Sequence, residues 1–275
     1  MNNTVVRTIS GIVFLAIVLG GLLFNQYLYA ALLVLMTGSM LYEFYKMTMG
    51  ERYKGSQYLA IFTGVSAFCC VFAIKAFSLP LHFISINAIL LLSLMTTSLF
   101  AKDKTDFKLY AFLYTGLVYI AMPLVLSNFI VFDKAGSFSG LLMLSFFCII
   151  WASDTGAYCV GMLFGKNGKK LFPTVSPKKS WAGFWGGLAT AILTGAVLFW
   201  TGLLEFPLIH CMILAAVMNV AAVYGDLFES QWKRVCEVKD SGNIIPGHGG
   251  MLDRFDSALF AIPAGVIYLV IIGLL

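Results

Sequence analysis

The chain has 275 residues, of which 60% are hydrophobic and 11% charged, with a formal net charge of +5 and a mean hydropathy of +0.90. Ordinary soluble domains carry about 25% charged residues. A soluble core of this size could not bury so much apolar surface, so the composition excludes a soluble domain and indicates an integral membrane protein. Alternation with a period of two is not evident, which argues against a membrane β-barrel.

Apolar stretches of about 20 residues predict an all-α polytopic bundle of about nine transmembrane helices. The predicted spans are residues 8–25, 27–47, 57–78, 80–101, 109–132, 141–164, 181–204, 206–229 and 252–275. Arg7 and the apolar run after it resemble a secretory signal, but no clear cleavage site follows, so we expect a retained first span. Breaks or kinks are expected at Pro80 and Pro123.

The basic residues are distributed unevenly between the two sides of the predicted bundle. With the N-terminus in the cytoplasm, all of the 18 Lys and Arg residues except Lys75 and Lys134 fall in cytoplasmic segments. Cytoplasmic loops of membrane proteins are enriched in Lys and Arg, and this predicts a cytoplasmic N-terminus. The same asymmetry accounts for the net charge, which therefore does not indicate a nucleic-acid partner.

Short loops and the absence of a sequence repeat predict one membrane domain, residues 1–275. Polar residues within the spans gather after residue 150, with Glu43 as the main exception. We therefore expect residues 141–275 to carry the chemistry, and residues 1–140 to form a scaffold for lipid contact and dimerisation. The six cysteines show no CxxC spacing and are expected to be small buried hydrophobic residues.

Ser153, Asp154 and Thr155 lie well inside the sixth predicted span. An acid at that depth costs roughly 2.5–3.5 kcal/mol on insertion scales. One interpretation is a hydrogen bond between helices, with Gly156 and Gly161 allowing close packing. The other places Asp154 on a water-filled cavity, where it binds a cation or a polar headgroup.

The loop after the sixth span is basic, with Lys166, Lys169 and Lys170 followed by the run Ser-Pro-Lys-Lys-Ser at 176–180. Lysines at this place are explained in part by anchoring at the cytoplasmic face. The run is more particular, because Ser176 or Ser180 could cap the next helix. Its N-terminus and the ammonium groups of Lys178 and Lys179 would then face one anion, and we expect at least one of these lysines to contact phosphate.

Two pairs of acids flank the polar segment between the last two spans. Asp226 and Glu229 end the eighth span, and Asp253 and Asp256 begin the ninth. A spacing of three places each pair on one helical face. A single pair is often only a solvated helix end, but two pairs on consecutive helices can converge. Their oxygens suit Mg²⁺, which takes one or two carboxylates together with substrate phosphates.

The polar residues together predict phosphoryl or nucleotidyl transfer, in which acids hold a metal and bases neutralise developing charge. No P-loop is present, which excludes a Walker-type nucleotide site. Gly247, Gly249 and Gly250 would let the backbone approach a ligand closely. His248 could act as a general base or contact phosphate, although a single His is more often a structural hydrogen-bond donor.

Residues 230–256 resemble the signature of the phosphatidate cytidylyltransferases, also called CDP-diacylglycerol synthases. The matching positions are Ser230, Lys233, Arg234, Lys239, Asp240, Gly242, Pro246, His248, Gly249, Gly250, Asp253, Arg254 and Asp256. Residues 154–158, 176–179 and 225–226 also follow the family's order, so the resemblance covers about residues 150–275. Two positions depart from the family pattern: Ala182 replaces an expected Glu, and Trp232 is bulkier than the expected residue.

The resemblance implies a reaction between CTP and phosphatidate that gives CDP-diacylglycerol and pyrophosphate for phospholipid biosynthesis. It also implies Mg²⁺ dependence, with Asp226 and Asp253 as the metal-binding acids, and a homodimer. Whether a second, monovalent cation binds is left open. We expect a multi-pass protein of the inner, cytoplasmic membrane whose active site faces the cytoplasm.

The expected site residues form two groups. The catalytic group is Asp226, Asp253, Lys233, Arg234, Lys239 and His248. The substrate-binding group is Asp154, Ser176, Lys178, Lys179, Asp240, Gly249, Gly250, Arg254 and Asp256. Because the nucleophile is already a phosphate anion, little general-base help is needed, which weakens a catalytic role for His248.

Two other functions compete with this interpretation. One is a related CTP-dependent transferase or kinase that acts on a polyprenol or another lipid phosphate. The other is a secondary transporter for a phosphorylated solute, suggested by the intramembrane acids Asp154 and Glu43. Transporters of that class are commonly built from inverted repeats, and none stands out in the sequence.

Overall fold

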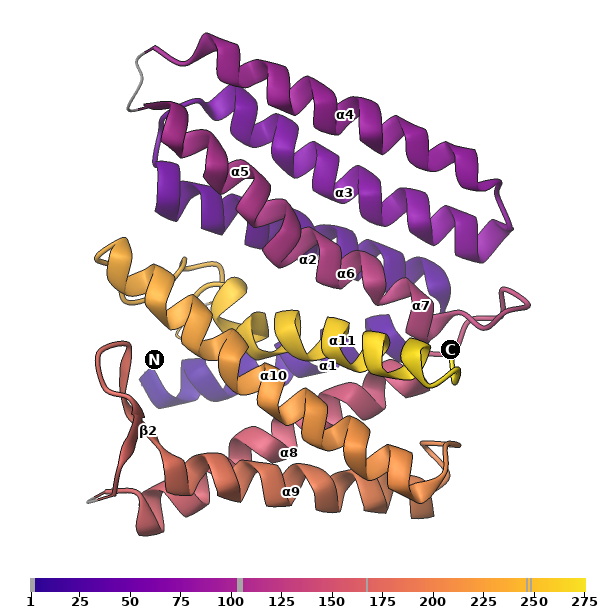
Figure 1. Ribbon diagram of the computed structural model, residues 1–275, viewed down its shortest axis with the longest axis vertical. Helices are drawn as coiled ribbons and strands as arrows, with labels where there is room; N and C mark the ends of the chain where they lie inside the picture. The colour runs from indigo at the N-terminus through magenta and orange to yellow at the C-terminus, as the bar shows by residue number, and fades with distance from the viewer. Residues whose placement is uncertain (1–2, 103–105, 167, 246, 248) are drawn as a thin grey trace. The chain divides into compact units, whose positions relative to one another are not determined.

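A computed structural model of the chain describes residues 3–102, 106–166, 168–245, 247 and 249–275, with only the backbone for residues 3–7 (Figure 1). The major helices are α1 (Asn3–Leu23), α2 (Gln26–Met49), α3 (Lys54–Phe77), α4 (Ile84–Thr96), α8 (Leu141–Phe164), α9 (Trp181–Trp200), α10 (Leu208–Val235) and α11 (Leu252–Ile271). Shorter elements are η1 (Leu81–Phe83), η2 (Thr97–Phe100), η3 (Asp106–Leu109), α5 (Tyr110–Gly116), η4 (Leu117–Ala121), α6 (Met122–Leu126) and α7 (Asn128–Val131).

Within the described residues, eight helical segments are long and apolar enough to cross a membrane. They are Gln26–Met49, Lys54–Phe77, Leu81–Phe100, Asp106–Val131, Leu141–Phe164, Trp181–Trp200, Leu208–Val235 and Leu252–Ile271. The first predicted span corresponds to α1 (Asn3–Leu23), of which Thr8–Leu23, the part with described side chains, is a shorter apolar helix. The all-α polytopic class is therefore confirmed.

The chain divides into two compact units. Unit 1 contains Met1–Ser139 and Val238–Arg254, and unit 2 contains Gly140–Glu237 and Phe255–Leu275. The polar segment that precedes α11 thus belongs with the N-terminal helices, whereas most of α11 itself belongs to unit 2.

The core of unit 1 is aromatic and is fixed by buried hydroxyl groups. The ring of Tyr29 on α2 lies 6.0 Å from that of Phe68 on α3, and its hydroxyl group is 2.5 Å from that of Ser127. The hydroxyl group of Tyr45 donates to the carbonyl of Leu113 at 2.8 Å. Side chains of α2 are thereby tied to both neighbouring segments of the unit.

Both predicted proline breaks are present in unit 1. Pro80 is extended (φ −62°, ψ 142°) and separates α3 from the span that begins at Leu81. Pro123 follows η4, a π-helical turn at Leu117–Ala121. A proline lacks the N–H group for the helical ladder and its ring collides with the carbonyl four residues earlier, so a wider turn before it relieves the clash.

Small residues let α8 and α9 pack closely in unit 2 (Figure 1). A Cβ atom at Gly156 would lie 2.1 Å from Oγ1 of Thr190, and one at Gly186 would lie 2.4 Å from Cβ of Val160. Close approach through small residues is how helices associate in membranes, where apolar side chains gain little from burial. The buried hydroxyl group of Ser153 also donates to Oδ1 of Asn219 on α10 at 2.6 Å.

A β-hairpin joins α8 to α9, which the sequence did not lead us to expect. Strand β1 (Lys170–Phe172) pairs antiparallel with β2 (Ser176–Ser180), with a bulge between Lys170 and Phe172. Of the two expected capping residues it is Ser180 that caps α9, accepting from the amide of Gly183 at 3.2 Å. The predicted lysine run therefore lies on a strand that ends at a helix N-terminus.

We predict that Gly156→Ala destabilises the fold, because the added methyl group would collide with Thr190. Overpacking of this kind typically costs about 1–3 kcal/mol. Thermal unfolding in detergent would measure the loss. Gly55→Ala is the matched control, since Gly55 also lies in a long helix and a Cβ atom there meets nothing within 4 Å. Equal stability of the two variants would contradict the packing argument.

Candidate functional site

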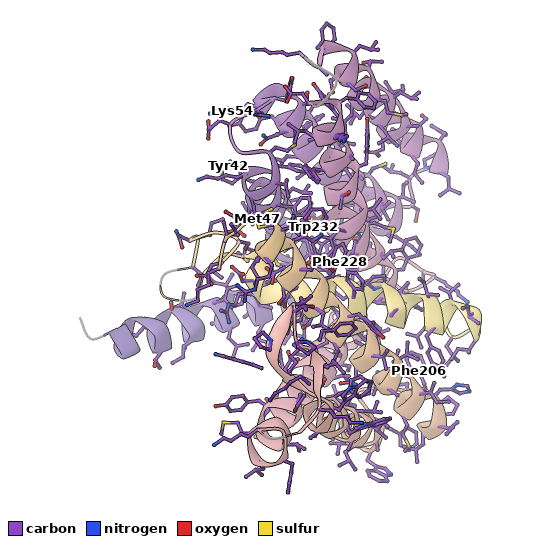
Figure 2. All side chains as sticks on the ribbon, turned by 60° about the vertical axis from the view of Figure 1, so that its left-hand side comes forward. Tyr42, Met47, Lys54, Phe206, Phe228 and Trp232 are labelled. Carbon is purple, nitrogen blue, oxygen red and sulfur yellow. The ribbon has the colours of Figure 1, made fainter. Side chains whose placement is uncertain are left out.

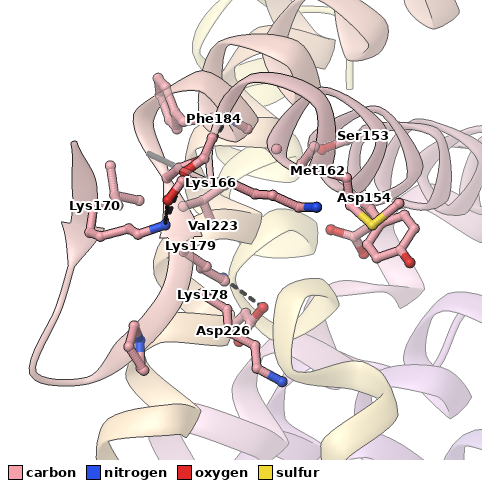
Figure 3. A pocket seen from close by; sticks show the side chains of 18 residues that line it. Ser153, Asp154, Met162, Lys166, Lys170, Lys178, Lys179, Phe184, Val223 and Asp226 are labelled. Carbon is pink, nitrogen blue, oxygen red and sulfur yellow. Dashed lines mark hydrogen bonds and ion pairs between the residues drawn. The ribbon is translucent and has the colours of Figure 1, made fainter. Parts of the chain in front are cut away.

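A cavity of about 680 Å³ lies in unit 2 between α8, the β-hairpin, the start of α9 and α10 (Figure 3). Part of its lining is apolar and includes Tyr158, Met162 and Phe184. The carboxylates of Asp154 and Asp226 also line it. A cavity of this size with a mixed lining suits an amphiphilic ligand. Asp154 therefore lies on a cavity, which agrees with the second of the two interpretations given for it. Its neighbours Ser153 and Gly156 contribute to the packing between helices.

Four lysines line the same cavity, but they are engaged differently. The ammonium group of Lys170 donates to the carbonyls of Gly165 at 2.9 Å and Lys166 at 3.2 Å, which fixes the turn after α8. Lys166 and Lys178 are exposed residues. Lys166, Lys178 and Lys179 are therefore the cations best suited to meet an anionic ligand.

Lys179 and Asp226 form an ion pair across the cavity. The Nζ atom of Lys179 lies 2.6 Å from Oδ2 of Asp226, and the two side chains are 26% and 34% exposed (Figure 3). Ser230, one turn further along α10, donates to Oδ1 of Asp226 at 3.2 Å. Both carboxylate oxygens of Asp226 are thus engaged, and a strand and a helix distant in sequence meet at this point.

Two further carboxylates of unit 2 interact with the pair. Asp154 from α8 and Asp256 from α11 each feel the repulsion of Asp226 and the attraction of Lys179, and Asp256 is also attracted by Lys233. The three carboxylates come from three helices and share the ammonium groups of Lys179 and Lys233. The excess of negative charge favours binding of a further cation.

The donor chemistry of this cluster fits Mg²⁺ only when a ligand completes the coordination. Among the residues that the structure describes, no three His, Cys, Asp or Glu side chains are close enough to hold a metal ion by themselves. Mg²⁺ commonly takes one or two carboxylates and fills its remaining positions with water and substrate phosphates. The carboxylate of Asp226 is a suitable hard ligand for such a shared site.

Lys233 and Glu229 make a buried ion pair on α10, at 2.5 Å. Glu229, expected on the same helical face as Asp226, is fully buried, and the Lys233 side chain is only 16% exposed. Lys233, predicted to be catalytic, therefore has a structural partner. The bulky Trp232 packs edge-on against Phe228 one turn earlier, with ring centroids 6.0 Å apart (Figure 2).

Asp253 lies in unit 1, where its carboxylate organises the signature segment. Its Oδ2 atom accepts hydrogen bonds from the amide of Ser241 at 2.9 Å, the hydroxyl group of Ser241 at 2.9 Å and the amide of Gly250 at 2.8 Å. Asp226 belongs to the other unit, so the convergence of Asp226 and Asp253 stays a prediction.

Glu43 on α2 was not among the predicted site residues, but it contacts the signature segment. Its carboxylate, 3% exposed, accepts from the amides of Met251 at 3.0 Å and Leu252 at 2.9 Å. An acid in an otherwise apolar span was the signal, but no pattern in the sequence indicated its partner.

The remaining predicted residues lie at or near the surface of their units. Lys239, Asp240, Arg234 and Arg254 are exposed, and Ser176 is half-buried in β2. Gly249 has a φ of +88°, a conformation that favours glycine. His248 and Pro246 lie outside the described residues. The departure at Ala182 falls in the first turn of α9, where the residue is half-buried.

Three known proteins that are similar to this chain are each named phosphatidate cytidylyltransferase. A phosphatidate cytidylyltransferase of Bacillus subtilis strain 168 is 39% identical over 181 residues, covering 66% of this chain and 65% of that protein. One from Staphylococcus epidermidis strain ATCC 12228 is 37% identical over 169 residues, covering 62% of each. One from Rickettsia bellii strain RML369-C is 37% identical over 158 residues, covering 55% of this chain and 66% of that protein. Each alignment spans less than two thirds of the relative's length.

The sequence profile described as the Cytidylyltransferase family matches residues 5–272. The match therefore includes the N-terminal spans, where the signature resemblance was absent, as well as the cavity of unit 2 and the signature segment of unit 1. Because it extends over nearly the whole length, this chain belongs to the cytidylyltransferase family.

Proposed function

We propose that the protein transfers the cytidylyl group of CTP to phosphatidate, giving CDP-diacylglycerol and pyrophosphate. The observation that carries this proposal is the cavity in unit 2, which combines an apolar wall with lysines and the Lys179–Asp226 pair. A lipid phosphate has the same division between apolar chains and an anionic head. The names of the relatives, phosphatidate cytidylyltransferase, support the same substrates.

The apolar part of the cavity suits the lipid substrate. Tyr158, Met162 and Phe184 would contact the region next to the acyl chains, and phosphatidate would enter sideways from the membrane. Its phosphate would meet the ammonium groups of Lys178 and Lys166, both of which line the cavity from exposed positions. Charge-assisted hydrogen bonds to phosphate are short and strong, so these contacts would fix the nucleophile.

In the reaction, an oxygen of the lipid phosphate attacks the α-phosphorus of CTP, and the bond from that phosphorus to the oxygen bridging to the β-phosphate breaks. Pyrophosphate leaves with the electron pair of the broken bond. Lys179 would turn from Asp226 towards the phosphates and neutralise charge that develops on them. No strong base is required, because the attacking oxygen is already anionic.

Mg²⁺ is part of the proposal. When bound, it would orient the triphosphate and stabilise the leaving pyrophosphate. Asp226 would supply one carboxylate, and the resemblance implies Asp253 as the second metal-binding acid. Asp154 and Asp256 would add negative potential around the cation, and whether a second, monovalent cation joins them is left open.

The site is proposed to face the cytoplasm from the inner membrane, since CTP is soluble and the basic segments predict that side. A homodimer is also proposed. Its interface is proposed on the span Leu81–Phe100 of unit 1, because only 6% of the apolar window of this span is buried within the chain.

We predict that the purified protein forms CDP-diacylglycerol from CTP and phosphatidate, and that activity rises from zero as Mg²⁺ is titrated in. Radiolabelled CTP and lipid extraction would measure the product. Polyprenyl phosphate and a diacylglycerol offered in competition test the related transferase and kinase activities. Failure to form CDP-diacylglycerol under several lipid conditions, or preferred labelling of another lipid, would refute the proposed acceptor.

We predict that Asp226→Asn and Asp253→Asn each lower turnover by at least about 100-fold, because each replaces a metal-binding carboxylate. Steady-state rates at saturating CTP would show the loss. Asp133→Asn is the matched control, since Asp133 binds the amides of Ala135 and Ser137 in a turn of unit 1 outside the proposed site. Near-normal turnover of either site variant removes that residue from the metal site.

A further inference from the structure

Glu43 connects the scaffold helix α2 to the start of α11, about two hundred positions away in the chain. Its carboxylate accepts from the amides of Met251 and Leu252, and α11 begins at Leu252. The first amides of a helix have no partner within the helix and need an acceptor from elsewhere. Glu43 therefore caps α11 from another helix, and its negative charge is favourable at a helix N-terminus.

Ser241 joins this cap to the acid Asp253. Its hydroxyl group lies 2.9 Å from Oδ2 of Asp253 and 3.3 Å from Oε2 of Glu43, so its single proton serves Asp253 first. The amides of Ser241 and Gly250 bind the same Asp253 oxygen. Glu43, Ser241 and Asp253 thus form one network within unit 1, and the backbone that Glu43 holds is the backbone that orients Asp253.

Two glycines of the signature segment make room for Glu43. A Cβ atom at Gly242 would lie 2.3 Å from Oε1 of Glu43. One at Gly250 would lie 2.6 Å from Oε2 of Glu43 and 2.3 Å from Oγ of Ser241. Neither glycine has a positive φ, so space and not backbone conformation requires them. For Gly250, the groups that approach the backbone are Ser241 and Glu43, and its approach to a ligand stays a prediction.

We propose that Glu43 is a positioning residue: it holds the segment before α11 at Ser241, Met251 and Leu252, so that Asp253 presents its carboxylate in one orientation. The inference rests on the proposed function in assigning Asp253 to Mg²⁺. Residues that orient a metal ligand are often nearly as important as the ligand, and their loss typically lowers metal affinity by about 10–100-fold. Glu43 itself touches no reacting atom in this account.

Glu43→Gln keeps the size of the side chain but replaces one carboxylate oxygen with an NH₂ donor. Because Met251 and Leu252 bind separate oxygens of Glu43, one of these amides would then face a donor. We expect faster amide hydrogen exchange in the peptide that covers residues 241–252. We also expect the Mg²⁺ concentration for half-maximal turnover to rise about tenfold or more. Thr37→Val is the matched control, because Thr37 is also buried on α2 and its hydroxyl group donates to the carbonyl of Leu33 in its own helix.

Three outcomes are decisive. Faster exchange at 241–252 together with a raised Mg²⁺ requirement, both absent from Thr37→Val, supports the proposal. Lower thermal stability with an unchanged Mg²⁺ requirement and unchanged local exchange overturns it, since Glu43 would then only stabilise the fold. If the wild-type protein forms no CDP-diacylglycerol, the proposed function fails, while exchange in Glu43→Gln still decides whether Glu43 holds the segment.

Ser241→Ala keeps the proposal testable if Glu43→Gln does not fold. It removes the hydroxyl group between the two carboxylates but leaves the amides of Met251 and Leu252 bound to Glu43. We expect a smaller rise in the Mg²⁺ requirement than for Glu43→Gln, with exchange of the 251–252 amides unchanged. A Mg²⁺ requirement equal to that of the wild type would overturn the link between the cap and Asp253.

Discussion

Charged groups inside membrane-spanning helices need partners, and this constraint organises the polar structure of the protein. An unpaired charge or polar group is costly where water is scarce. Glu43 meets the requirement with backbone amides of α11, Glu229 with Lys233, and Asp226 with Lys179. In two of these cases the partner comes from a segment distant in the sequence, so pairing the charge also fixes the fold locally.

The pair formed by Lys179 and Asp226 has a different setting from the other two. Glu43 and Glu229 are buried, whereas Lys179 and Asp226 remain partly exposed on the wall of a cavity. A partly exposed pair can exchange partners when a ligand brings opposite charges of its own. The proposed triphosphate with Mg²⁺ would do so, since it would offer phosphates to the lysine and a cation to the aspartate. A pair that is stable by itself would in this way become a binding site.

The sequence was sufficient for the all-α polytopic class, for eight of the nine predicted spans and for the family. Runs of apolar residues predicted the eight long helices because length and hydropathy alone determine which segments can cross a bilayer. For Asp154 the sequence left two interpretations, a water-filled cavity or a hydrogen bond to a neighbouring helix. Either would satisfy a carboxylate within a span. The polar run from Ser230 to Asp256 carried the resemblance that the family profile then confirmed over residues 5–272.

The partners of those residues could not be predicted in the same way. Glu43 and Leu252 are 209 positions apart, and no local pattern connects a carboxylate on α2 to a helix start there. Lys233 was predicted to be catalytic, and its pairing with Glu229 on the same helix could not be foreseen. The hairpin at 170–180 was missed because its strands are only three and five residues long and show no alternation of apolar and polar residues. The types of residue that a site needs can be predicted from its chemistry, whereas their hydrogen-bond and ion-pair partners are known only from the folded structure.

The central claim is that Lys179 and Asp226 act as a unit on the same bound triphosphate, and a double-mutant cycle on kcat/KM for CTP tests it most directly. The cycle compares Lys179→Met, Asp226→Asn and the double variant, with Lys169→Met as the charge-matched control from the exposed loop. Groups that act together lose activity non-additively. We expect the double variant to be about as impaired as the worse single variant, and Lys169→Met to be nearly unaffected. Losses that add in full, or a Lys179→Met variant as active as the control, would contradict the claim.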